Sequence, residues 1–221
     1  MGIWRHYLHF ERSGKVLPAL DWGLYFPTVF KNPTKYIIPQ PEMRDVLAKL
    51  RKEGKFIFLA TNSHWEYMEL IMSTTLGKDW RSFFDMVCAN ARKSYFWSTE
   101  TEPKMYVMDR SKDDFKGPVV QSGADLTVDS SVTYLEGSAK ILEDLVKKVR
   151  PEVSQHRYIY FGDQYLSDVV LCSERPGWDG VAVIEEMSFR GEEYKKIEAA
   201  CPLPPLDLKM IPYADHWGDF F

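Results

Sequence analysis

Cysteine is scarce in this 221-residue chain, and its three cysteines lie far apart, at positions 88, 172 and 201. The sequence contains no C-x-x-C pair. A sparse, odd-numbered set of cysteines argues against a disulfide framework or a zinc site and is typical of a reducing compartment. We therefore expect an intracellular protein of the cytoplasm or the mitochondrial matrix.

The sequence also lacks the features of three other classes of protein: those that span a membrane, those that bind nucleic acid or anionic membranes, and those that bind a metal through paired histidines. No apolar run approaches the roughly 18 residues of a membrane-spanning helix, so no membrane span is expected. The formal net charge is −4, which gives no electrostatic reason to expect nucleic acid or an anionic membrane as a partner. No two of the five histidines pair at metal-ligand spacing, because His6 and His9 would face opposite sides of an expected strand.

Strand and helix patterns alternate along the chain, which predicts an α/β protein with a parallel sheet covered by helices. We predict one core over residues 1–200 and an extended, proline-containing tail over residues 201–221. Residues 97–135 are polar and irregular, and we interpret them as an insertion of short strands and loops. Strands are expected at 4–10, 55–60, 84–89, 157–161 and 180–184, and helices at 41–53, 66–76, 138–149 and 185–199.

Polar side chains follow three of the predicted strands, where ligands of an open α/β sheet bind. Thr61 and Asn62 offer a hydroxyl and a backbone N–H to a phosphate oxygen. Lys93 offers a positive charge to a phosphoryl group. Asp163 and Asp168 offer the carboxylate oxygens that Mg²⁺ prefers. Together these residues indicate a phosphate site with a metal site.

Each of these residues also has an ordinary structural explanation. Thr61 and its neighbours resemble a helix cap, a single lysine such as Lys93 is most often a solvated surface residue, and Asp163 fits a turn at a strand end. Residues 129–133 superficially resemble a nucleophile motif, but they follow a polar stretch, and we interpret them as a loop. The indication of a site comes from the order of the motifs and their place on the predicted elements.

Several segments of the chain together resemble one known family, the cytosolic purine 5'-nucleotidases of the haloacid-dehalogenase-like superfamily. The resemblance spans residues 32 to about 187. The segments that carry it are Asn32-Pro33-Thr34-Lys35-Tyr36-Ile37, Gly54-Lys55-Phe56-Ile57-Phe58-Leu59-Ala60-Thr61-Asn62-Ser63, Asp79-Trp80-Arg81-Ser82-Phe83-Phe84-Asp85, Ala91-Arg92-Lys93, Tyr160-Phe161-Gly162-Asp163 with Asp168, and Gly177-Trp178 before Ile184-Glu185-Glu186.

The resemblance implies a three-layer, Rossmann-like core and Mg²⁺-dependent hydrolysis of purine nucleoside monophosphates. It assigns phosphate binding to Thr61, Asn62 and Lys93, and Mg²⁺ binding to Asp163 and Asp168. Members of the family carry a large, base-reading cap between their first and second motifs. Only 50 residues separate Glu11 from Thr61 here, so most of the cap is missing. The resemblance therefore implies a core with a small insertion, over residues 97–135, in place of the large cap.

The stretch Phe10-Glu11-Arg12-Ser13-Gly14-Lys15-Val16 departs from the family's first motif, Phe-Asp-x-Asp-Gly-Thr-Val. In this alignment Glu11 replaces the nucleophilic aspartate, which would form an aspartyl-phosphate. Ser13 replaces the general acid/base, and Lys15 replaces a threonine. The resemblance therefore implies a degenerate nucleophile loop, in which Lys15 takes the place of the metal ion beside Asp163 and Asp168.

Three functional hypotheses remain open at this point. The first is a catalytically degenerate protein, without a cofactor, that serves as a structural or binding subunit of a larger assembly and contacts protein partners. The second is an active Mg²⁺-dependent 5'-nucleotidase, with a re-routed nucleophile or with the missing groups on another chain. The third is a nucleotide or phosphate sensor that uses Thr61, Asn62 and Lys93.

Overall fold

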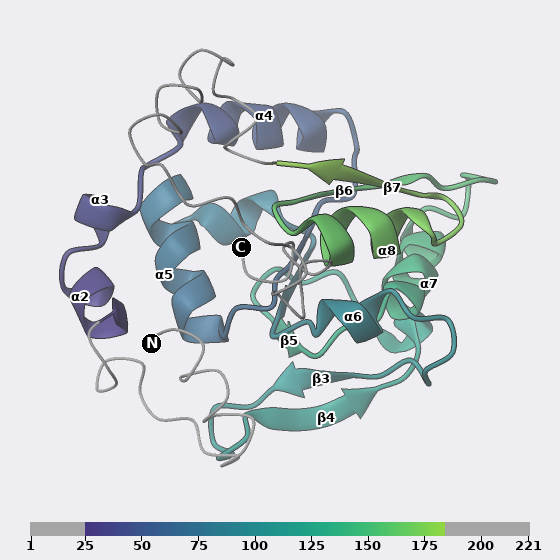
Figure 1. Ribbon diagram of the computed structural model, residues 1–221. Coiled ribbons are helices and arrows are strands. Elements are labelled where there is room, and N and C mark those ends of the chain that lie inside the picture. Colours follow the sequence, from purple (N-terminus) through teal and green to yellow (C-terminus); the bar gives the residue numbers. More distant parts are fainter. Residues whose placement is uncertain (1–24, 184–221) are drawn as a thin grey trace, which may run out of the picture. The chain divides into compact units, whose positions relative to one another are not determined.

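The computed structural model describes residues 25–183, which fall into two compact units. The first unit comprises the described part of residues 1–153, and the second comprises the described part of residues 154–221 (Figure 1). Each unit is described by itself, and the single core expected over residues 1–200 stays a prediction. The elements expected at 4–10 and 185–199 and the tail from 201 onward lie outside the described residues.

A five-stranded sheet forms the centre of the first unit, in the order β1-β2-β5-β3-β4. Strands β1, β2 and β5 are parallel, whereas β3 runs antiparallel to both β5 and β4. The three parallel strands therefore end at one edge of the sheet. The strands are β1 (Phe58–Ala60), β2 (Met86–Ala89), β3 (Met105–Met108), β4 (Lys116–Val120) and β5 (Thr133–Leu135).

Helices flank this sheet, with α5 and α7 on either side of the strands in Figure 1. The helices predicted at 41–53, 66–76 and 138–149 are confirmed as α4, α5 and α7 to within about one residue at each end. The helical elements of the first unit are α2 (Tyr25–Lys31), α3 (Pro33–Tyr36), α4 (Pro41–Lys52), α5 (Trp65–Leu76), α6 (Lys93–Phe96) and α7 (Ala139–Val149), with the 3-10 helices η2 (Trp80–Phe83) and η3 (Gly123–Asp125).

The local sequence explains why α4 begins and ends where it does. Pro41 occupies the first turn, where its missing N–H costs nothing. Basic residues gather in the last turn, next to the negative end of the helix dipole. Gly54 follows with φ of 73°, a conformation that suits glycine at the end of a helix.

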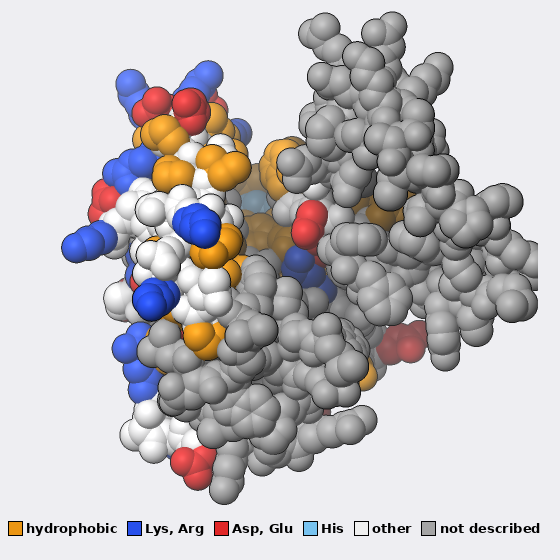
Figure 2. Space-filling view, turned by 60° about the vertical axis from the view of Figure 1, so that its left-hand side comes forward, with side chains coloured by type: hydrophobic (Ala, Val, Ile, Leu, Met, Phe, Trp, Pro, Cys, Tyr) orange, Lys and Arg blue, Asp and Glu red, His pale blue; other side chains and the backbone are white. Residues whose placement is uncertain are grey.

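The hydrophobic stripe of α4 is only partly buried. Leu47 packs against the core of the first unit, whereas the exposed fractions of Met43 and Val46 are 47% and 50%. Figure 2 shows hydrophobic side chains exposed among lysine and arginine side chains on one face of the molecule. The helix is therefore present as predicted, and part of its apolar stripe stays exposed.

The main corrections to the sequence-based description concern strands. Residues 133–135 were assigned to the insertion, but they form β5, the third parallel strand, which pairs with β2. A three-residue strand after a polar loop gives no periodicity, so the sequence could not reveal it. The strands expected at 55–60 and 84–89 are shorter in the structure, as β1 and β2. Those expected at 157–161 and 180–184 are shifted by one or two residues, to β6 (Tyr158–Gly162) and β7 (Trp178–Ala182).

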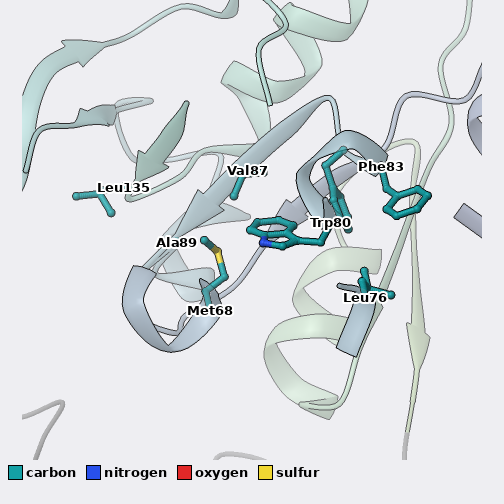
Figure 3. Packing of buried hydrophobic residues seen from close by; sticks show 8 residues of the cluster. Met68, Leu76, Trp80, Phe83, Val87, Ala89 and Leu135 are labelled. Atoms are coloured by element: carbon teal, nitrogen blue, oxygen red, sulfur yellow. The ribbon is translucent and has the colours of Figure 1, made fainter. Parts of the chain in front are cut away.

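The core of the first unit is built around Trp80, which is fully buried. In Figure 3 its indole lies among Met68 of α5 and Val87 and Ala89 of β2. The indole N–H donates to Glu69 Oε1 over 3.1 Å, so this buried polar atom is satisfied. The Trp80 side chain therefore connects α5, η2 and β2.

The second unit contains a two-stranded parallel sheet of β6 and β7. A π-helical turn, η4, follows β6 and continues into a short helix, α8. Among residues 25–183, none of the helices combines the length and the apolar character that crossing a membrane requires. The elements are β6 (Tyr158–Gly162), η4 (Tyr165–Val170), α8 (Leu171–Ser173) and β7 (Trp178–Ala182).

Replacing Trp80 should remove the centre of this core. We expect Trp80→Ala to lower the free energy of unfolding by about 4 kcal/mol, because it deletes a buried aromatic side chain and leaves a cavity. Tyr95→Ala is the control, since Tyr95 is 63% exposed and its loss should change stability by no more than about 0.5 kcal/mol. Urea unfolding followed by circular dichroism measures both, and equal losses would contradict the assignment.

Candidate functional site

Backbone hydrogen bonds join the loops that follow the three parallel strands of the first unit. The Thr61 N–H donates to Cys88 O over 3.0 Å, and the Ala91 N–H donates to Thr61 O over 2.8 Å. The Gly137 N–H in turn donates to Ala91 O over 3.1 Å. These bonds continue the sheet pairing beyond the strand ends, so the three loops form one connected edge.

Asn62 and Lys93, which were both predicted to contact phosphate, meet at this edge. The side-chain oxygen of Asn62 accepts from the backbone N–H of Lys93 over 2.9 Å. Lys93 is the first residue of α6, so this bond fixes where that helix begins. The Thr61 hydroxyl accepts from the Ser63 N–H over 3.1 Å, a local turn that fits the structural explanation of this residue. The phosphate-binding roles of Thr61, Asn62 and Lys93 stay predictions.

Three non-glycine residues at this edge adopt left-handed backbone conformations. Asn90 has φ of 46°, Arg92 of 53° and Glu136 of 52°. Such conformations are uncommon outside glycine, and they concentrate at functional sites where the surrounding structure holds them. Arg92 directly precedes Lys93 and Asn90 lies three residues before it, so the backbone that presents the lysine is constrained.

Glu136 is a residue of this edge that the sequence reasoning missed. It follows β5, and only 7% of its surface is exposed. Its Oε1 atom accepts a hydrogen bond from the ammonium group of Lys116 and lies 3.3 Å from Nη2 of Arg92. No sequence signal marked it, because β5, the three-residue strand that Glu136 follows, has no readable periodicity.

Cys88 lies on β2 beneath this edge. Burial, which is the larger cause, and the negative charge of Glu136 together raise the pKa of the Cys88 thiol to about 12. A thiol with so high a pKa stays protonated at neutral pH. Cys88 therefore packs as a small apolar side chain and is no candidate nucleophile.

Asp168, in the second unit, is completely buried within η4. Its Oδ1 atom accepts from the Ser167 hydroxyl over 2.9 Å, and its Oδ2 atom accepts from the Gln164 N–H over 3.3 Å. Gly162, at the end of β6, lies directly against it, since a Cβ there would come within 2.5 Å of Asp168 Cβ and Cγ. The carboxylate is thus held in one position by hydrogen bonds and close packing.

Asp163 differs from Asp168, because it is exposed in the turn between β6 and η4. Among residues 25–183, no three histidine, cysteine, aspartate or glutamate side chains lie together as a metal-binding group. The chemistry of the two carboxylates nevertheless fits Mg²⁺, which takes oxygen ligands and usually keeps several waters. The metal-binding role of this pair stays a prediction.

The first-motif residues Glu11, Ser13 and Lys15 lie outside the described residues. Their roles, the strand expected at 4–10, and the expectation that Lys15 lies beside Asp163 and Asp168 therefore stay predictions. The structure joins the loops that carry Thr61, Asn62 and Lys93 within the first unit and places Asp163 and Asp168 in the second.

Comparison with known proteins points to one family. The model of the 5' nucleotidase family matches residues 23–201, a span that leaves out the stretch 10–16. Human 5'-nucleotidase domain-containing protein 1 is 28% identical over 213 residues, and its bovine counterpart is 30% identical over 214. Each of these alignments covers 90% of this chain but only 44% of the relative, so the chain spans less than half of either protein.

A further relative carries a similar name. Human 5'-nucleotidase domain-containing protein 2 is 31% identical over 165 residues, which cover 75% of this chain and 29% of that protein.

A substitution that adds one methyl group at Gly162 tests the contact between Gly162 and Asp168. We expect Gly162→Ala to destabilise the second unit by about 2 kcal/mol or more, because the new Cβ would overlap the buried carboxylate. Gly54→Ala is the control: nothing lies within 4 Å of its Cβ position, so only backbone strain of about 1 kcal/mol is expected. Hydrogen exchange of the β6 amides should rise in the first variant and stay unchanged in the second.

Proposed function

The chain belongs to the 5' nucleotidase family, and on that premise we propose that it is a catalytically degenerate member. In this proposal it works by binding, as a structural or binding subunit of a larger assembly. The observation that carries the proposal is the pair Glu11 and Ser13, which stand where the family resemblance places two catalytic aspartates.

The physical argument concerns both replaced positions. Glu11 is one methylene longer than aspartate, and a misplacement of about 1 Å at a reacting centre can cost about a hundredfold in rate. Ser13 cannot exchange a proton near neutral pH as a carboxylate does, which removes a contribution of about 10²- to 10⁴-fold. The two changes together are expected to leave no useful turnover.

Phosphate binding is supported by a different set of residues. The Asn62 bond to the Lys93 N–H and the backbone bonds between the two loops hold them together independently of any nucleophile. The Lys93 ammonium supplies a positive charge, and a Lys–phosphate hydrogen bond is stronger than one between neutral groups. We infer that Thr61, Asn62 and Lys93 bind the phosphate of a purine nucleotide, a property that would also serve a nucleotide or phosphate sensor.

A second candidate function is an active Mg²⁺-dependent 5'-nucleotidase that acts on purine nucleoside monophosphates. The observation that favours it is Asp168, whose buried carboxylate is held by Ser167 and Gln164. In this alternative Asp163 and Asp168 hold Mg²⁺, which would neutralise phosphoryl charge when bound. Lys93 would hold the phosphoryl group in place, and the nucleophile would come from a carboxylate other than Glu11.

A turnover assay separates the two candidates. We expect no Mg²⁺-dependent release of phosphate from IMP, GMP or p-nitrophenyl phosphate above background, together with measurable binding of inorganic phosphate by calorimetry. Lys93→Met should weaken that binding about tenfold or more, because it removes a charge-assisted hydrogen bond to phosphate. The variant keeps the backbone N–H that donates to Asn62 Oδ1.

The matched control is Lys49→Met, which removes an exposed lysine from α4 and should leave phosphate affinity unchanged. Turnover that disappears in Asp163→Asn would overturn the proposal in favour of the active enzyme. Equal effects of Lys93→Met and Lys49→Met would remove the phosphate role of Lys93.

The assembly part of the proposal has its own test. A binding subunit should elute from native extract, in size-exclusion chromatography with light scattering, at a mass well above the 25.8 kDa of the chain. Dilution of the purified protein serves as the control for non-specific association. A single monodisperse species with the mass of one chain would contradict the expected assembly.

A further inference from the structure

Three cationic side chains surround Glu136 beside the loop that carries Lys93. Arg92 and Lys116 both pair with the Glu136 carboxylate. The ammonium nitrogens of Lys104 and Lys116 lie 5.5 Å and 4.8 Å from the centre of the Tyr106 ring. We call Arg92, Lys104 and Lys116 the basic cluster.

The charges of the basic cluster are not balanced by Glu136. Three positive charges face one carboxylate, which leaves a surplus of two positive charges. The pKa of Lys104 is raised, chiefly by a hydrogen bond with Tyr106 and to a lesser extent by the charge of Glu136, whereas the charge of Arg92 lowers it. Like charges held this close repel each other, and an added anion would relieve that repulsion.

The fold holds the basic cluster in place. Glu136 is buried directly after β5, Arg92 is fixed in a left-handed conformation just before α6, and Lys116 begins β4. The Tyr106 ring, between β5 and β4 in the sheet, gives two of the ammonium groups a surface that favours cations. The positions of the three charges are therefore set before any ligand binds.

The basic cluster is accessible to solvent and adjacent to the proposed phosphate site. The side chain of Arg92 is 45% exposed, and Lys104 is exposed just before β3. Because β3 is antiparallel to β5, Lys104 lies at the end of the hairpin where β5 finishes. Arg92 directly precedes Lys93 in the sequence. A ligand bound at Lys93 would therefore lie beside one member of the basic cluster.

We propose that the basic cluster binds a second phosphoryl group of a ligand whose first phosphoryl group is held by Thr61, Asn62 and Lys93. This inference rests on the phosphate binding put forward under the proposed function. It specifies the ligand class as a molecule with two phosphoryl groups, such as a nucleoside diphosphate or a bisphosphate. Arginine and lysine are the side chains that recognise such groups.

The ordinary explanation is that the basic cluster is only an internal ion-pair network that fastens the β3–β4 hairpin to β5. That explanation accounts for Arg92 and Lys116, which pair with Glu136. It gives Lys104 only a minor part, because the hydrogen bond of Lys104 is to Tyr106 and the charge of Glu136 is a smaller influence on it. Lys104 is therefore the residue on which the two explanations differ.

Calorimetric titration of the full chain with inorganic pyrophosphate and with inorganic phosphate, without divalent cations, tests the proposal. We expect pyrophosphate to bind at least about tenfold more tightly than phosphate, because it reaches both sites. Lys104→Met should weaken pyrophosphate binding about fivefold and phosphate binding less than twofold. Lys104 is exposed and lies outside the ion pairs of Glu136, so this change should leave the fold intact.

Lys112→Met is the matched control, since Lys112 is an exposed lysine of the same hairpin outside the basic cluster. It should leave both affinities unchanged. Equal affinities for the two anions, or equal effects of the two lysine variants, would overturn the inference. If Lys93→Met still weakens phosphate binding about tenfold in that case, the proposed phosphate site stands and only the second subsite fails. If neither anion binds, the proposed phosphate binding itself is wrong.

Discussion

The described first unit depends on parallel strands whose pairing continues past their ends. Strands β1, β2 and β5 are only three or four residues long, which by itself would define their loops poorly. The bonds from Thr61 to Cys88, from Ala91 to Thr61 and from Gly137 to Ala91 extend the pairing by one or two residues. Because buried backbone groups must find partners, these bonds fix the loops as firmly as the strands.

The extended strand pairing stabilises the unusual backbone conformations and the buried carboxylate at this edge. Left-handed residues such as Asn90, Arg92 and Glu136 each cost about 1 kcal/mol or more, and they persist only where their surroundings hold them. A buried carboxylate such as Glu136 likewise needs partners, which Arg92 and Lys116 provide. The same contacts that satisfy Glu136 also leave the local charge positive, and this links the stability of the edge to the anion binding that we propose.

The second unit uses a different device to fix a carboxylate. The π-helical turn η4 places Asp168 against the end of β6, where Gly162 leaves room for it. Single π-helical turns are rare and occur often at functional sites. Membership of the 5' nucleotidase family gives this arrangement a context, although the relatives that match are more than twice as long as the chain. The preference for binding over turnover stays a proposal, which rests on the identities of residues 11 and 13.

The sequence by itself determined the α/β class, the three long helices of the first unit, and the loops that carry Thr61, Asn62 and Lys93. These features are local, because a helix of eleven or twelve residues has a readable period and caps. Only the tertiary structure decided that residues 133–135 complete the parallel sheet, that Glu136 gathers Arg92 and Lys116, and that Asp168 sits in a π-helical turn. These features depend on contacts between residues that lie far apart in the sequence. A strand of three residues has no readable periodicity, and the sequence around a single buried carboxylate does not indicate which residues it contacts.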